Sequence, residues 1–65
     1  MTLREIRMKL GRYSFATDRL AMLATYERDI DRQLNMLEAI RILQNKVRNY
    51  LFELITAEYD LRRKL

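Results

Sequence analysis

Residues 25–41 read TYERDIDRQLNMLEAIR, and this stretch combines a cluster of charged side chains with apolar side chains at helical spacing. Ile30, Leu34 and Leu37 follow one another at intervals of four and three residues, the spacing of one apolar face of a helix. Two interpretations compete: a helix that carries catalytic charges, and a helix whose apolar residues form a coiled-coil seam. The rest of the chain helps to decide between them.

The composition of the chain predicts an all-α fold. Its 65 residues include no proline and one glycine, Gly11, so residues that favour turns are scarce. A lone chain of this length buries only about 60% of its unfolded surface. It has no cysteine for a disulfide and, without histidine, lacks the usual zinc ligands. Because 49% of its residues are apolar, we expect residues 1–65 to form one module completed by further copies or by another helical protein.

Capping and turn-forming residues predict where the helices begin and end. Thr2 and Glu5 have the spacing of a capping box, so a short helix is expected over about 2–10. The glycine and the hydroxyl side chains that follow predict a connection over about 11–17. A long amphipathic helix is then expected over about 18–64, forming an oligomeric coiled coil or helical bundle.

The long predicted helix carries an apolar seam in which spacings of three and four residues alternate. At Leu37 two registers meet with spacings of three and three. The candidate oligomer interface consists of Leu20, Leu23, Ile30, Leu34, Leu37, Ile40, Val47, Leu51, Leu54, Leu61 and Leu65. The charged residues of the opening stretch fall beside or opposite this seam, which favours the coiled-coil interpretation. Further apolar residues widen the face, so residues 43–61 are expected to meet more than one neighbouring helix.

Residues suited to catalysis are scarce. Arg28, an Ile-Asp pair and Arg41 are similar in order to residues of the helical chorismate mutases. However, Arg28 precedes Ile30 by two residues where that family has three, and Phe52 occupies the position of the family's lysine. A shift of one residue turns a helical side chain by about 100°. The chain has no histidine, cysteine or glycine-rich phosphate loop, so we expect no enzymatic activity, no cofactor and no metal.

Charge and hydropathy limit the classes of partner. Residues 1–12 carry four basic side chains against one acidic side chain, whereas residues 13–61 are net acidic. The candidate contacts to an anion or a nucleic acid are Arg4, Arg7, Lys9 and Arg12. Four charges are a small footprint for binding phosphates, so a protein partner is favoured over a nucleic acid. No apolar run approaches the about 18 residues of a membrane span, and no signal-like core follows Met1, so a cytoplasmic location is expected.

The segments MTLREIRMKL, DRLAML and RDIDRQLNMLEAIRILQNKVRNY resemble the C-terminal part of MerR-type transcriptional regulators. The resemblance implies a short helix below a DNA-binding domain, and a long helix that pairs antiparallel with its counterpart in a dimer. It therefore implies a dimerisation role in transcription regulation. The matching positions are Leu3, Glu5, Ile6, Arg7, Leu10, Leu20, Leu23, Ile30, Leu34, Leu37, Leu43, Val47 and Tyr50. No winged helix-turn-helix precedes them in this sequence, so no DNA-reading residue can be transferred.

A second resemblance covers the other end of the chain. Residues 36–65 are similar to the last long helix of TolC-like outer-membrane efflux proteins, in which leucine, alanine and tyrosine residues pack an antiparallel α-barrel. A third alternative is a small basic helical dimer that binds nucleic acid. The sequence favours a non-enzymatic helical oligomerisation or regulatory-interaction module over both.

Overall fold

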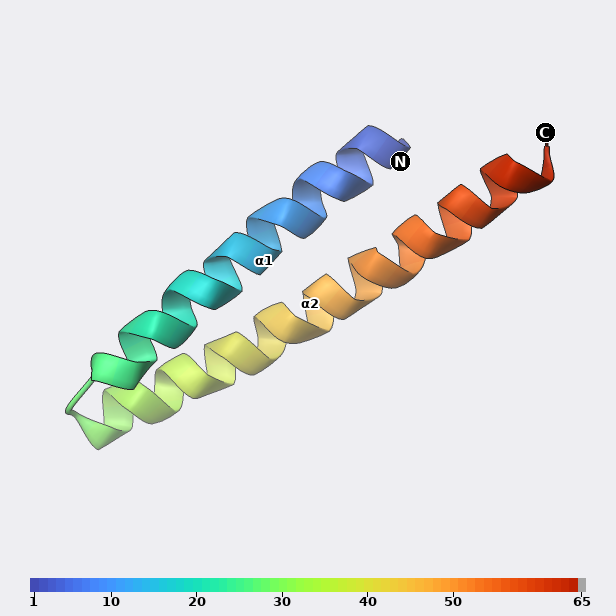
Figure 1. The fold of residues 1–65 in the computed structure, drawn as a ribbon. Helices are drawn as coiled ribbons and strands as arrows, with labels where there is room; N and C mark the ends of the chain where they lie inside the picture. Colours follow the sequence, from blue (N-terminus) through green and yellow to red (C-terminus); the bar gives the residue numbers. More distant parts are fainter. Residues whose placement is uncertain (65) are drawn as a thin grey trace.

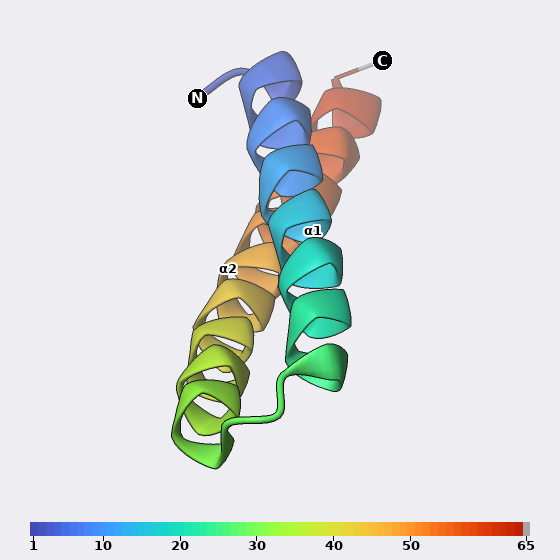
Figure 2. The same cartoon turned by 90° about the vertical axis from the view of Figure 1, so that its left-hand side faces the viewer.

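The computed structural model describes residues 1–64 as a hairpin of two helices (Figure 1). Helix α1 spans Leu3–Tyr26 and helix α2 spans Ile30–Arg63. Both views show the two chain ends at one end of a rod and the turn at the other (Figures 1 and 2). The rod measures 53 × 15 × 14 Å. The predicted all-α fold is confirmed, and neither helix among the described residues is long and apolar enough to cross a membrane.

The structure corrects the predicted helix boundaries. The connection expected over about 11–17 is helical, so α1 extends well beyond the helix predicted over about 2–10. Gly11 keeps a negative φ, and a glycine inside a helix costs only about 1 kcal/mol relative to alanine. The Thr17 hydroxyl donates a 2.7 Å hydrogen bond to the carbonyl of Tyr13 instead of capping a new helix. The helix predicted over about 18–64 is therefore split, and only its second part forms α2.

The real turn lies inside the charged cluster of the opening stretch. Glu27 has an extended backbone and ends α1. The Asp29 carboxylate accepts a 3.2 Å hydrogen bond from the backbone N–H of Arg32 and caps α2. The side-chain amide of Gln33 donates a 3.0 Å hydrogen bond to the carbonyl of Ala24, which also accepts a 3.3 Å hydrogen bond from the backbone N–H of Glu27 at the end of α1. These charged residues form a turn, whereas the sequence predicted an uninterrupted helix through this stretch.

Replacing Asp29 with alanine is expected to destabilise the hairpin by about 1 kcal/mol, because an N-terminal cap of α2 is lost. Urea unfolding followed by circular dichroism measures this loss. Asp29→Asn is the matched control, since it keeps a side-chain oxygen that can accept the same hydrogen bond. An equal loss in both variants would mean that the negative charge of Asp29, and not its cap, stabilises the turn.

The two helices meet along regular heptads, in which spacings of three and four residues alternate. On α1 the buried and half-buried residues of this seam are Leu3, Ile6, Leu10, Tyr13, Thr17, Leu20 and Ala24. On α2 they are Gln33, Met36, Ile40, Leu43, Val47, Tyr50, Leu54 and Ala57. The seam of α2 is uninterrupted, and Leu37 lies off it. The break in register predicted at Leu37 is corrected, because that pattern joined residues from both sides of the turn.

Two tyrosines and two lysines link the helices near the middle of the hairpin. The rings of Tyr13 and Tyr50 stack with centroids 5.5 Å apart and planes 12° apart. The ammonium of Lys9 lies 5.8 Å from the Tyr50 centroid, and that of Lys46 lies 5.8 Å from the Tyr13 centroid. Each helix therefore places a lysine four residues before a tyrosine, and each lysine reaches the ring on the other helix. These contacts fix the register of the antiparallel pair.

Candidate interaction surface

The core of a single hairpin is small. Among residues 1–64, only Ile6, Ala24 and Ile40 are buried, with 4%, 3% and 9% of their surface exposed. No large side chain in this part of the chain is completely enclosed. Because most helical stability comes from packing of the apolar face, one seam between two helices leaves much of the available apolar surface unused.

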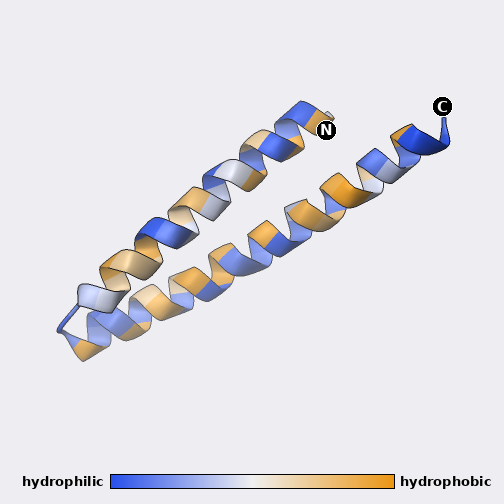
Figure 3. Cartoon of the chain, viewed as in Figure 1, coloured by the Kyte–Doolittle hydropathy of each residue, from blue (hydrophilic) through white to orange (hydrophobic). Residues whose placement is uncertain are grey.

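Many large apolar side chains are exposed instead. Figure 3 shows hydrophobic residues recurring along the whole length of both helices. Leu37, Leu51 and Ile55 of α2 are 50%, 45% and 59% exposed. Single exposed apolar residues are ordinary on a protein surface, but contiguous apolar surface marks a site of interaction. The sides of the two helices on which these residues lie therefore indicate where a partner binds.

One side of the hairpin is marked by an ion pair between the helices. The guanidinium of Arg7 lies 2.9 Å from the carboxylate of Glu58. Seven residues make two turns of a coiled-coil helix, so Ser14 lies on the same side of α1 as Arg7, and Leu51 on the same side of α2 as Glu58. We call this side the Gly11 flank. It comprises Arg7, Gly11, Ser14, Asp18 and Ala21 of α1 and Leu34, Leu37, Arg41, Gln44, Arg48, Leu51, Ile55 and Glu58 of α2.

The Gly11 flank has a different character on each helix. On α1 it presents small side chains, among them Gly11, Ser14 and Ala21. On α2 it presents two pairs of large apolar side chains, and three polar residues separate the pair Leu51 and Ile55 from the other pair. This side of the hairpin therefore combines small residues on one helix with exposed large residues on the other.

The opposite flank is more polar. Lys9 and Lys46 lie on it over the two tyrosine rings. Glu53, two turns after Lys46, lies on the same side of α2. This flank is a weaker candidate for contact with another apolar surface.

The outward side of α1 carries an apolar stripe. Met8, Phe15 and Met22 are spaced seven residues apart and are all exposed. A shallow hollow beside them is lined by Phe15, Asp18, Arg19, Met22 and Leu23. This stripe provides one apolar residue every two turns of α1.

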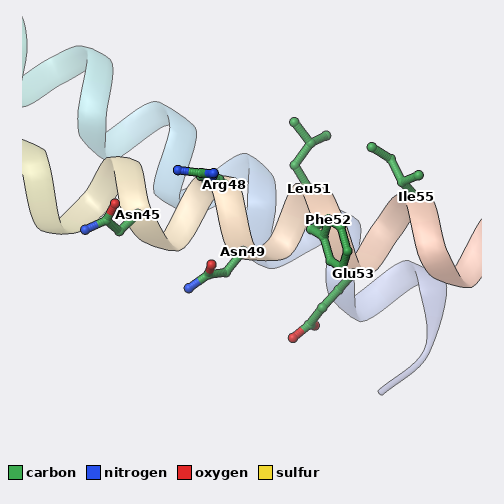
Figure 4. Close-up of a pocket in the computed structure, with 7 residues that line it drawn as sticks. All are labelled: Asn45, Arg48, Asn49, Leu51, Phe52, Glu53 and Ile55. Atoms are coloured by element: carbon green, nitrogen blue, oxygen red, sulfur yellow. The ribbon is translucent and has the colours of Figure 1, made fainter.

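The outward side of α2 has an open hollow that borders the Gly11 flank (Figure 4). Its lining residues are Asn45, Arg48, Asn49, Leu51, Phe52, Glu53 and Ile55. Figure 4 shows Leu51 and Ile55 projecting to one side of α2, and Asn49 and Glu53 projecting to the other. The boundary between apolar and polar surface therefore runs along this helix.

The structure separates the predicted interface residues into two groups. Leu20, Ile40, Val47 and Leu54 lie in the seam between α1 and α2 of the same chain. The exposed group, available to a partner, consists of Leu23, Ile30, Leu34, Leu37, Leu51 and Leu61. Leu65 lies outside the described residues. The role of the exposed group in an oligomer stays a prediction.

The four predicted anion contacts lie on more than one side of α1. Arg7 pairs with Glu58 on the Gly11 flank, and Lys9 lies over Tyr50 on the opposite flank. Arg4 and Arg12 are exposed. The four side chains do not form a single patch on the described hairpin, and binding of nucleic acid by them stays a prediction.

Comparison with protein-family models, curated proteins and solved structures found no match. The resemblances to MerR-type regulators and to TolC-like efflux proteins therefore stay predictions.

Proposed function

We propose that this chain is a helical association module that binds other helices, and in particular further copies of itself. One observation carries the proposal: large apolar residues of α2 remain about half exposed along the Gly11 flank, while only three of residues 1–64 are buried. In this proposal the chain acts by binding and not by catalysis.

The energetics of a short chain support association. Burying a leucine or isoleucine side chain completely contributes about 1.5–3 kcal/mol to stability. Leu37, Leu51 and Ile55 are only about half buried within the hairpin, so each contributes only about half of that free energy. Helical proteins below about 70–80 residues commonly obtain the missing burial by oligomerisation. A partner helix on the Gly11 flank would cover these side chains and make both hairpins more stable.

The resemblance to MerR-type regulators suggests a context for such association. In that family the equivalent region joins two subunits through antiparallel helices. Under our proposal, the hairpin would supply helices for dimerisation of a transcription regulator. This role depends on association, which is tested first.

We expect the thermal midpoint of the helical circular-dichroism signal to rise with protein concentration, because association stabilises the folded state by mass action. Sedimentation equilibrium over the same concentrations should show a mass above that of one chain. A monomer whose midpoint is independent of concentration up to the millimolar range would contradict self-association.

A further inference from the structure

We infer that a second copy of the chain packs on the Gly11 flank, with α1 of each copy against α2 of the other and both turns at the same end of the resulting four-helix bundle. This inference rests on the proposed function and adds the surface and the orientation of the partner.

The first observation is that nothing in the single chain requires a glycine at position 11. It lies inside α1 with a negative φ, so the backbone does not require glycine there. A Cβ atom added at Gly11 would meet nothing within 4 Å in the single chain. Glycine at this position costs the helix about 1 kcal/mol relative to alanine, and no contact within the hairpin compensates for that cost. Close approach of a helix from outside the chain would use the missing side chain.

The Gly11 flank of a second copy provides a surface that is complementary to the region around Gly11. Small residues of α1 and large apolar residues of α2 lie on the same flank. A two-fold rotation about an axis parallel to the rod therefore brings Gly11 and Ser14 of one copy to Leu51 and Ile55 of the other. By symmetry, the same contacts form a second time with the roles of the two copies exchanged. A surface that complements itself in this way is the requirement for a symmetric dimer.

Charge on the same flank selects the orientation. Towards the turn, α1 presents Arg7, then Gly11, then Asp18, while α2 presents Glu58, then Ile55, then Arg48. When both turns lie at the same end, these two series run side by side. Asp18 then approaches Arg48 of the other copy, at the same time as Gly11 approaches Ile55.

Neither Asp18 nor Arg48 has an ion-pair partner among residues 1–64, so both charges are available for this contact. With the turns at opposite ends, a two-fold rotation places α1 against α1 and α2 against α2. Neither match is then made, because Gly11 no longer faces Ile55 and Asp18 no longer faces Arg48. Charge complementarity of this kind fixes the register of an interface more than it adds affinity.

Disulfide cross-linking tests the orientation, because the chain has no cysteine of its own. Ala21 and Gln44 each lie fourteen residues towards the turn from the Arg7–Glu58 ion pair, which places them at the same level of the hairpin. Protein carrying Ala21→Cys is mixed with protein carrying Gln44→Cys and oxidised mildly. We expect the mixed disulfide to form at least about tenfold faster than in a mixture of Ser14→Cys with Gln44→Cys, because Ser14 lies two turns away from Ala21 and its replacement by cysteine is nearly isosteric. The reverse order of rates would overturn the inferred orientation.

Substitution of Gly11 tests the surface. Gly11→Leu should weaken self-association at least about tenfold, because a large side chain overfills a close contact between helices. Arg12→Leu is the matched control, since the next residue points about 100° away. It should leave the affinity within about threefold. Circular dichroism at high concentration confirms that both variants are helical.

The outcomes separate the two proposals. If the wild-type chain self-associates and Gly11→Leu associates equally well, the Gly11 flank is not the interface, and the proposed function stands. If the wild-type chain remains a monomer at all concentrations, self-association fails, and the inferred dimer fails with it.

Discussion

Replacing Ile40 with alanine is expected to destabilise the hairpin by about 2–5 kcal/mol, the usual loss on truncating a packed isoleucine. Ile40 is 9% exposed and is one of only three buried residues in the described chain. Small domains have a total stability of only about 5 kcal/mol at the low end of the usual range, so the variant should lose a large share of its free energy of unfolding. Urea unfolding followed by circular dichroism, at several protein concentrations, measures the loss.

Ile42→Ala is the matched control for Ile40→Ala. The two residues are of the same type on the same helix, but Ile42 is 51% exposed and lies away from the seam. Its truncation should cost less than about 1 kcal/mol, because little buried surface is lost. A loss at Ile42 as large as the loss at Ile40 would mean that another helix covers Ile42, and it would contradict a partner bound on the Gly11 flank.

Some features of the fold could be predicted from the sequence because they depend on neighbouring residues. The absence of proline and the capping box at the start of the chain indicated helix, and α1 does begin at Leu3. The Thr2 hydroxyl accepts a 3.2 Å hydrogen bond from the backbone N–H of Glu5, which confirms this half of the predicted capping box. Local chemistry of this kind is readable without knowledge of the tertiary structure.

The position of the turn could not be predicted by the same reasoning. Gly11 was the strongest local signal for a break, but a helix tolerates one glycine when packing on both sides of it is continuous. Asp29 is three residues before Arg32, a spacing that fits a charged pair on a helix as well as a helix cap. The choice depends on whether α1 can pack against α2 from Leu3 onward, and that is a property of two distant segments.

The interaction surface could not be predicted from the sequence for the same reason, because its position depends on which distant segments pack together. An apolar residue at helical spacing predicts contact with some helix, but it does not indicate whether that helix belongs to the same chain. Ile40 and Leu51 were therefore predicted together, although one is buried within the hairpin and the other is exposed. The repeated Lys-x-x-x-Tyr spacing at Lys9 and Lys46 was a signal for the central stack, and it becomes meaningful only once the helices are known to be antiparallel.

The second large effect is expected for a charge placed on the Gly11 flank. Leu51→Asp should weaken self-association at least about a hundredfold, because a buried unpaired charge at an interface typically costs 3–5 kcal/mol or forces the surfaces apart. The hairpin itself should survive, since Leu51 lies outside the seam between α1 and α2. Sedimentation velocity measures the association, and circular dichroism at one concentration checks the helical content.

Ile42→Asp is the control that makes this result specific. It adds the same charge to an exposed apolar position of the same helix, away from the Gly11 flank. If apolar association were general, both variants would dissociate to the same extent, since both remove a large apolar side chain and add the same charge. If the partner covers the Gly11 flank, only Leu51→Asp should give monomers. Dissociation by Ile42→Asp alone would move the interface to the other side of α2, where Gly11 plays no part.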